Sequence, residues 1–485
     1  MEQSQVLAEP ASATVTPSSP ARLSPLVKLC YSLGEIPIAI RMASFNNFLL
    51  FFYTNVIMLS PSLAGLALAL GRVWDGINDP LVGYLSDNTT SRFGRRRPYL
   101  FASVIPLGLT FYLLWNPPDG LGTWGNFAYL ALAYMLMDGC FTFYSTPYLA
   151  LGAELSRDYH ERTQVVTARA VVHTLGAVFA LVCFSRVVGT SPTAIQEGVA
   201  LGVSTLSPEL LRVGFASVGA LLAVVMIGGG FIAFSGSREG KLTGSGQQLS
   251  FAAFFRSFTA TLHNRPFRIE LLSFGFLVFA WALHQPLTLY VYRDWLAMEA
   301  QVPTVMTLFF LATLISLGLW ARLARHVGKN RAFQLCVLWS ILVLSLFPLM
   351  RADMPHHWFY LFVIFIGLGA GGYALPASIV ADIIDYDELQ TGERREGLFF
   401  SLWTLVMKVT AALAIGCVGF GLDFIGYLPN QPQTEATLQG LKLLYGPIPA
   451  MFLLVSLLIF RRFPLTQESH ADIQRQLQER RTRGA

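Results

Sequence analysis

The sequence predicts an all-α membrane protein whose twelve transmembrane helices form two bundles of six. Three observations predict this fold. First, 54% of the 485 residues are hydrophobic and only 13% are charged, whereas a soluble domain carries about 25% charged residues. Second, apolar segments recur from residue 26 to residue 460, each long enough to cross a bilayer, which takes about 20 helical residues. Third, loop sequences of the first half return in the second half, about 230–235 residues later.

The apolar segments give the order of the spans, and the polar stretches between them give the domain organisation. The spans are expected over residues 26–56, 62–86, 98–116, 126–151, 164–189, 211–235, 268–292, 302–320, 332–350, 357–383, 396–423 and 440–460. We expect a disordered N-terminal tail, a six-helix bundle, a central loop, a second six-helix bundle and a charged C-terminal tail, over residues 1–25, 26–235, 236–267, 268–460 and 461–485.

The basic residues of the loops indicate how the helices are oriented. They concentrate in the loops after the second, fourth, eighth and tenth spans, whereas the loops after spans 1, 3, 7, 9 and 11 hold only Arg293, Arg351 and Lys442. Basic loops stay in the cytoplasm, so both tails and the central loop are expected there. We therefore expect a multi-pass protein of a bacterial inner (plasma) membrane.

The repeated loop motifs follow spans that occupy the same place in each half. Gly83 is followed by RFGRRR after the second span, and Gly318 is followed by RHVGKNR after the eighth. Pro147 precedes ERT after the fourth span, and Pro376 precedes GERRE after the tenth. Parallel repeats of this kind place the substrate site between the halves, near the middle of the bilayer.

Ionisable residues inside the apolar spans indicate which helices line that site. Asp75 and Asp79 lie in the second span, Asp138 near the middle of the fourth and Lys408 near the middle of the eleventh. A charge at this depth costs about 2.5–3.5 kcal/mol on insertion scales, so it normally faces the bundle interior with a partner. Asp75 and Asp79 share one helix face, so they need a metal ion, a basic side chain or a proton. Lys408, from the other half, is the natural counter-charge.

Other ionisable residues leave several pairings open. Glu35 and Arg41 flank Pro37 in the first span and could pair with each other. Arg169 lies closer to the cytoplasmic end of the fifth span, where its side chain could face the cavity or extend to the interface. A static set of ion pairs that only holds the halves together is the alternative to a transport role for Asp75, Asp79, Asp138 and Lys408.

Several motifs, in order along the chain, resemble one family of transporters. WDGINDP, PYLALGAELS, DIIDYDELQTGERREG and the lysine in LVMKVTAALA resemble the glycoside–pentoside–hexuronide:cation symporters of the major facilitator superfamily, of which the melibiose carrier is the best-known member. The resemblance implies the major facilitator fold and cation-driven uptake of a sugar. It would make Asp75 and Asp79 cation ligands, with Na⁺ possible there, Thr142 a neighbour of the cation site and Lys408 the charged partner across the cavity.

The fourth span departs from the melibiose carrier. Ser145 stands where that carrier has an aspartate, and Ala39 stands near the sugar-facing aspartate of its first helix. PLVGYLSDNTTSRFGRRRPYL and the place of Asp138 in LMDGCFTFYSTPYLALGAELS instead resemble the sucrose–proton symporters and their animal relatives. This resemblance implies that Asp138, two helical turns from Ser145 on the same face, is the protonation site. H⁺ is therefore the expected coupling ion and Na⁺ the alternative.

The loop DIIDYDELQTGERREG after the tenth span is rich in charge and predicts a cytoplasmic gate. Its gate residues are Asp382, Asp385, Glu393, Arg394 and Arg395. They are expected to pair with charged residues of the first half when the cytoplasmic side closes, in a contact that breaks as the halves rock. The expected gate residues of the first half are Asp87, Arg92, Arg95, Arg96, Arg97, Arg157 and Arg162. The alternative is that these arginines only set the topology.

The sequence holds no motif for enzymatic chemistry, since GxSxG, a Walker loop and HExxH are all absent. We expect no enzyme, no cofactor and no nucleic-acid partner. The function expected first is a proton-coupled symporter of a sugar or glycoside, working by alternating access as a monomer in the lipid bilayer. A lipid or lysolipid carrier is one alternative, and a non-transporting sensor or assembly factor is another. The residues expected at the substrate or as its counter-charge are Lys408, Arg169, Trp74, Tyr148 and Trp403. The aromatic rings could stack on a sugar; the alternative, which is the more frequent one at helical spacing, is that they face lipid or the core.

Overall fold

The computed structural model describes residues 23–89, 91, 94–155, 159–188, 208–236 and 261–483, and the regular structure among these residues is helical throughout. Most of the expected N-terminal tail and central loop lies outside these ranges. The helices begin and end close to the expected spans.

The first span is a helical run with one break. The break falls at Gly34 and Glu35, directly before a helix that carries Pro37 in its first turn. Proline favours that position because the missing N–H would have no intrahelical partner there. Glu35 therefore lies at a helix junction. The segments of this run are α1 (Pro25–Leu33), α2 (Ile36–Ser44) and the π-helical turns η1 (Phe45–Leu49) and η2 (Phe52–Val56).

The remaining helices complete the two halves. The first half continues with α3 (Pro61–Asn88), α4 (Arg97–Trp115), α5 (Gly122–Glu154), α6 (Tyr159–Val188) and α8 (Pro208–Gly236). The second half begins with α10 (Arg265–Tyr290), η3 (Val291–Trp295), η4 (Glu299–Gln301), α11 (Val302–Val327), α12 (Lys329–Leu346) and η5 (Phe347–Leu349). It ends with α13 (His356–Ala370), η6 (Gly371–Ala374), α14 (Leu375–Thr391), α15 (Glu396–Phe424), α16 (Glu435–Tyr445), α17 (Pro447–Phe460) and α18 (Gln467–Arg483).

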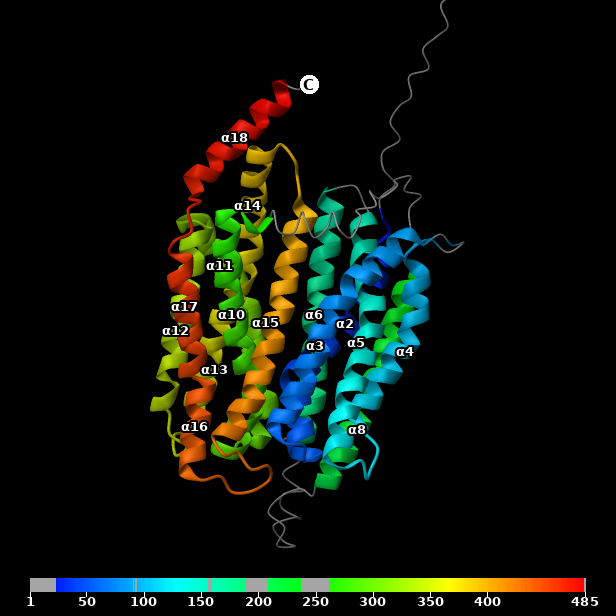
Figure 1. Cartoon of the computed structure of the whole chain (residues 1–485), viewed down its shortest axis with the longest axis vertical. Helices are drawn as coiled ribbons and strands as arrows, with labels where there is room; N and C mark the ends of the chain where they lie inside the picture. Colours follow the sequence, from blue (N-terminus) through cyan, green and yellow to red (C-terminus); the bar gives the residue numbers. More distant parts are fainter. Residues whose placement is uncertain are drawn as a thin grey trace, which may run out of the picture.

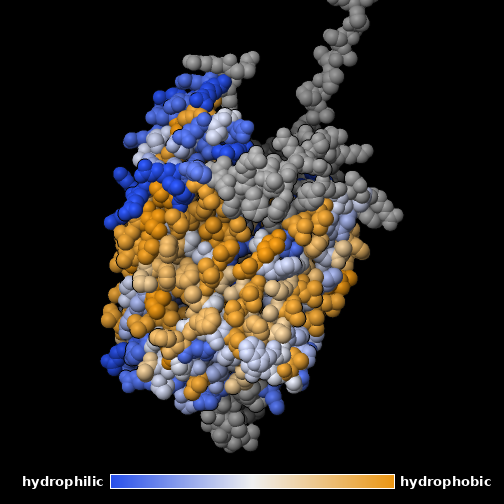
Figure 2. Space-filling model, in the orientation of Figure 1, coloured by the Kyte–Doolittle hydropathy of each residue, from blue (hydrophilic) through white to orange (hydrophobic). Residues whose placement is uncertain are grey.

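By length and composition, ten helical stretches within the described ranges could cross a membrane. The two others that complete the expected twelve are the broken first span and α3, which carries Arg72, Asp75 and Asp79 in its interior. Figure 2 shows a broad hydrophobic band around the middle of the molecule and hydrophilic residues at both ends. This distribution is typical of a protein that spans a bilayer.

The two halves lie side by side (Figure 1), and their main contacts are made by two helix pairs and by η1 against α10. α3 packs against α15, and α6 packs against α11. Where α3 crosses α15, Gly65 and Gly419 bring the two backbones together: a Cβ on Gly419 would overlap the carbonyl oxygen of Pro61, and a Cβ on Gly65 would lie 2.9 Å from the carbonyl oxygen of Ile415. Small residues allow this close approach in membrane proteins.

The expected charged C-terminal tail contains a docked helix, α18, which packs against α14. Its apolar residues Ile473 and Leu477 are buried. The Gln474 amide donates to Asp385 (2.6 Å), and Arg480 donates to the carbonyl of Leu389 (2.6 Å). We call the end of the molecule that carries α18 the inner end and the opposite end the outer end (Figure 1).

Candidate functional site

Three charged side chains meet between the halves at mid-depth. Asp75 and Asp79 project from one face of α3, and Lys408 reaches them from α15. Its Nζ lies 2.8 Å from Asp75 Oδ2 and 2.5 Å from Asp79 Oδ2. The Thr142 hydroxyl of α5 donates to Asp75 Oδ1 (3.3 Å). The expected pairing of Lys408 with both carboxylates is thus present in the structure.

With both carboxylates ionised this cluster would carry one net negative charge, since one lysine faces two carboxylates. The Asp75 side chain is 8% exposed and that of Asp79 is 33% exposed, so Asp79 is the member that solvent or a solute reaches. Within the described part of the chain, no group of three or more His, Cys, Asp or Glu residues could hold a metal ion. A cation here would therefore rely on two carboxylates and neutral oxygens such as that of Thr142.

A second ion pair lies within the first half. The Arg41 guanidinium of α2 donates to Asp138 Oδ1 of α5. Asp138 is fully buried, and its other oxygen, Oδ2, has no hydrogen-bond partner among the described residues. The Arg41 guanidinium also lies 4.2 Å from the ring centre of Phe141. Ser145 is buried on the same helix, two turns away.

Glu35 pairs with α6, and of the open alternatives the pairing of Glu35 with Arg41 is absent from this structure. Glu35 Oε2 accepts from Arg169 Nε (2.8 Å), and Glu35 Oε1 lies 3.3 Å from His173 Nδ1. Six residues of α-helix turn the chain by about 240°, so Glu35 and Arg41 face different neighbours. Arg169 is accordingly an ion-pair partner of Glu35 and does not extend alone to the interface.

The three aromatic candidates for substrate contact differ in accessibility. Tyr148 is fully buried; its ring stacks on Tyr31 at 4.7 Å, and its hydroxyl donates to the Tyr31 carbonyl (2.9 Å). The structure therefore places Tyr148 in the packed core of the first half. Trp403 stacks on Phe274 at 4.2 Å, which covers one face of the indole. Trp74 is 40% exposed.

The charged segment that was expected as a loop is mostly helical: Asp382, Asp385 and Asp387 lie in the last turns of α14. In this state the segment pairs within its own half. Asp382 accepts from Lys329 (2.6 Å) and Asp385 from Arg394 (3.0 Å). Hydrogen bonds to Glu388 and Asp385 raise the pKa of Arg394 above its usual value, so it stays charged. Arg395 binds Asp387 at 2.7 Å, and the N–H of Glu393 donates to Thr391 (3.3 Å).

The structure describes the side chains of only some of the expected gate residues of the first half. Arg97 donates to the carbonyl of Phe234 (2.9 Å), and Arg96 is buried whereas Arg95 is half-buried. The side chains of Asp87, Arg92, Arg157 and Arg162 lie outside the described residues. The expected cross-half contacts at the inner end belong to the state that is closed there, and they stay a prediction.

Polar contacts join the halves at the outer end, and the sequence reasoning missed them. The Tyr427 hydroxyl lies 2.8 Å from Asn55 Oδ1 and 2.7 Å from Asp294 Oδ2. Asn430 Nδ2 donates to the Asn55 carbonyl (2.6 Å), and the Thr54 hydroxyl lies 2.6 Å from that of Tyr290. This structure is thus held closed at its outer end.

A repeat in the sequence could have pointed to this contact. Tyr53-Thr54-Asn55 and Tyr292-Arg293-Asp294 each end a span, 239 residues apart. Both lie in π-helical turns, and each turn is followed by a non-glycine residue of positive φ, Met58 (62°) and Ala297 (48°). Uncharged residues such as Asn55 do not stand out when only buried charges are searched for.

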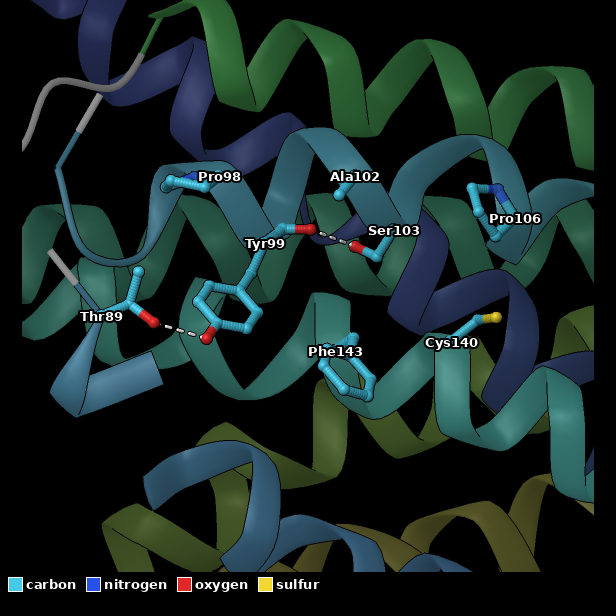
Figure 3. Close-up of a pocket in the computed structure, with 8 residues that line it drawn as sticks. All are labelled: Thr89, Pro98, Tyr99, Ala102, Ser103, Pro106, Cys140 and Phe143. Carbon is cyan, nitrogen blue, oxygen red and sulfur yellow. Dashed lines mark hydrogen bonds between the residues drawn. The ribbon is translucent and has the colours of Figure 1, made fainter. Parts of the chain in front are cut away.

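An apolar groove of about 380 Å³ lies apart from these charges, between α4 and α5. In Figure 3 the rings of Tyr99 and Phe143 lie beside each other, and the Tyr99 hydroxyl meets Thr89. Pro106 has no N–H, so it leaves the carbonyl of Ala102 without its helical partner. The residues that line the groove are Thr89, Pro98, Tyr99, Ala102, Ser103, Pro106, Cys140 and Phe143.

Two six-helix halves that share a charged cluster at mid-depth define a membrane transport protein. The profile of the family described as MFS/sugar transport protein, where MFS stands for major facilitator superfamily, matches residues 30–467, and the chain belongs to this family.

Relatives and solved structures agree with this assignment. An uncharacterized symporter of Synechocystis sp. is 29% identical, over 93% of this chain and 96% of that protein. Sodium-dependent lysophosphatidylcholine symporter 1 of Gallus gallus is 27% identical, over 95% of this chain and 90% of that protein. The inward-open xylose transporter XylE of E. coli shares the fold, with a TM-score of 0.60 at 14% identity over 91% of this chain and 96% of that one. The predicted fold class is confirmed.

Proposed function

We propose that the protein is a secondary active symporter that couples movement of its substrate to a monovalent cation bound at Asp75 and Asp79. The observation that carries this proposal is the position of Lys408, which comes from the opposite half and lies within hydrogen-bond distance of both carboxylates. A charged cluster assembled from both halves changes when the halves move. Cation affinity and the state of the transporter are then linked.

Charge balance favours this cluster over Asp138 as the place where the coupling ion binds. Lys408 neutralises one of two carboxylates, which leaves one negative charge for a cation. Asp138 already has Arg41 as its counter-charge, and a proton on Asp138 would leave a largely buried guanidinium unpaired, which is costly. Oxygen ligands suit hard cations, so we favour Na⁺, with H⁺ at the same carboxylates as the alternative.

For the substrate we propose an amphiphile with an apolar chain, of the lysophospholipid class. The sodium-dependent lysophosphatidylcholine symporter of Gallus gallus, aligned over nearly the whole chain, supports this class. The buried position of Tyr148 and the covered face of Trp403 leave fewer aromatic surfaces for a sugar ring. A sugar or glycoside is the second candidate, supported by the description of the family.

Transport by the full-length protein in proteoliposomes tests these assignments. We expect a Na⁺ gradient to drive accumulation of labelled lysophosphatidylcholine, and we expect Asp75→Asn to abolish that accumulation. The double variant Arg41→Gln/Asp138→Asn removes an ion pair without leaving a lone charge, so it should keep Na⁺-driven uptake. Uptake that follows only a pH gradient and is lost in the double variant but kept in Asp75→Asn would overturn the assignment of the cation site.

A panel of labelled mono- and disaccharides in the same vesicles tests the substrate. Accumulation of a sugar, with no movement of lysophospholipid, would replace the amphiphile by the second candidate. A non-transporting sensor would show no counterflow of either. We place the protein as a monomer in a bacterial plasma membrane with both termini in the cytoplasm, in keeping with its basic loops.

A further inference from the structure

A pocket of about 1310 Å³ opens at the inner end of the second half, away from the charged cluster. Its walls come from the end of α11, the start of α12, the η6–α14 segment and the stretch that leads into α18. These elements adjoin one another in Figure 1. The pocket thus exists only when α18 is docked, since Gln467, Glu468 and His470 form one wall.

One side of the pocket is basic. Arg325, Lys329 and Arg331 line it. Lys329 is paired with Asp382 at 2.6 Å, but neither arginine lies within ion-pair distance of a carboxylate in the described part of the chain. Glu468 is the other acidic residue of the lining. The two arginines therefore leave an excess of positive charge.

The N-terminus of α12 adds positive electrostatic potential to the basic side of the pocket. α12 begins after Gly328, which has a φ of 86° and offers no side chain to cap the helix. The first N–H groups of a helix have no intrahelical partner, and the positive end of the helix dipole favours an anion. Together with Arg325 and Arg331, this end of α12 suits a phosphate group.

The other side of the pocket is apolar and continues towards the membrane. Leu317, Trp320 and Ala324 of the membrane-spanning helix α11 line it, with Phe463 opposite. The Trp320 indole N–H donates to the carbonyl of Leu368 (2.7 Å), which fixes the ring in the wall. The pocket therefore joins an anion-binding end to an apolar strip that a hydrocarbon chain would follow.

We propose that this pocket binds an anionic phospholipid of the adjoining leaflet, with its phosphate at Arg325, Arg331 and the start of α12 and an acyl chain along α11. Basic pockets between helices at the cytoplasmic side are the usual sites of such headgroups. Because α18 forms a wall of the pocket, the bound lipid also holds α18 against α14. The proposal is independent of the substrate and of the coupling ion.

Thermal unfolding of the detergent-purified full-length protein tests the site. The protein is titrated with phosphatidylglycerol, with phosphatidylcholine, or with inorganic phosphate. We expect phosphatidylglycerol alone to raise the unfolding temperature in a saturable way, and Arg325→Gln/Arg331→Gln to raise the half-saturating lipid concentration at least about tenfold, since each basic residue contributes about 1 kcal/mol near an anionic surface. Arg322→Gln is the matched control, because Arg322 lies on the same helix but does not line the pocket.

Hydrogen exchange of α18 provides the second measurement. Phosphatidylglycerol should slow exchange in α18 of the wild type and of Arg322→Gln, and it should not do so in the double variant. Equal stabilisation by inorganic phosphate would show a free-anion site and overturn the lipid assignment. Equal effects of the two lipids, or an unchanged half-saturating concentration in the double variant, would also overturn it.

Discussion

Lys408 lies close enough to Asp75 and Asp79 to bind both carboxylates at once. In this site Asp79 is more exposed than Asp75, and the loss of this lysine would leave two like charges about 6 Å apart on one helix face. Such a pair repels unless one member takes up a proton or a cation. The consequence of removing Lys408 therefore depends on which carboxylate is left.

Lys408→Ala should abolish substrate accumulation, and Lys408→Ala/Asp79→Asn should recover part of the stability that the single variant loses. The physical reason is that the double variant keeps one carboxylate, which a cation or proton can neutralise. A double-mutant cycle on thermal stability should give a coupling energy of about 1–3 kcal/mol. Defects that simply add would show that Lys408 does not stabilise Asp79.

Arg41→Gln should destabilise the protein by about 3–5 kcal/mol, because it leaves the fully buried Asp138 carboxylate without its counter-charge. Arg41→Gln/Asp138→Asn should recover most of this loss. Chemical unfolding of both variants measures the difference. A double variant as unstable as the single one would mean that the packing of Arg41 on Phe141 matters more than its charge.

Single residues also set the limit of what the sequence could predict. A lysine and two aspartates deep in apolar spans need one another, so their meeting was predictable. The partners of Glu35 and Arg41 depend on how α2 is rotated against α5 and α6, and a pattern of spans does not contain that rotation. The burial of Tyr148 was not predictable for the same reason, because a buried and a cavity-facing tyrosine look alike in the sequence.

At the level of helices, the contact between Gly65 of α3 and Gly419 of α15 fixes how closely the halves approach near the outer end. It leaves no room for a side chain. The break in the first span and the π-helical turns at the outer ends of spans 1 and 7 are irregular features of the helices themselves. Periodicity alone predicted these spans as plain helices, because it reports which positions are apolar and not which tertiary contacts a residue makes. Glu35 at the break contacts α6 of its own half, whereas Thr54 and Asn55 contact the other half.

Gly419→Ala should push α3 and α15 apart and shift the molecule away from the state closed at the outer end. The added methyl group would overlap the carbonyl oxygen of Pro61. Gly416→Ala is the matched control on the same helix, since its Cβ would lie 3.7 Å from Ala69 in ordinary contact. Distances between spin labels at Ser62 and Leu428 report the opening, and equal distributions in the two variants would contradict the prediction.

For the molecule as a whole, twelve spans in two halves were predictable because each span carries its own apolar signal. Which end of the molecule is closed in this structure was not predictable from the sequence. It depends on outer contacts such as those of Asn55 and Tyr427, each of which contributes only about 1 kcal/mol. The expected pairing of the charged end of α14 with the first half stays a prediction, and in this state Asp382 and Asp385 bind Lys329 and α18.

Tyr427→Phe should move the population towards opening at the outer end by about fivefold. The substitution removes a hydroxyl that binds Asn55 of the first half and Asp294 of its own half. One hydrogen bond contributes about 1 kcal/mol, which corresponds to about this factor. The same spin-label pair measures the shift. Tyr129→Phe is the control, since the Tyr129 hydroxyl donates to the Leu113 carbonyl within the first half. An equal shift in Tyr427→Phe and Tyr129→Phe would show that the Tyr427 contacts do not hold the outer end closed.

The unequal charges of Asp75, Asp79 and Lys408 have an electrical consequence. With no cation bound, this cluster carries one net negative charge at mid-depth, and a membrane potential acts on it with up to about 2.3 kcal/mol per 100 mV. A potential that is negative inside pushes that charge outward, so voltage drives the return of the empty transporter, whereas the loaded, neutral cluster crosses without electrical work. Collapsing the potential should then slow net uptake while exchange of substrate between the two sides continues.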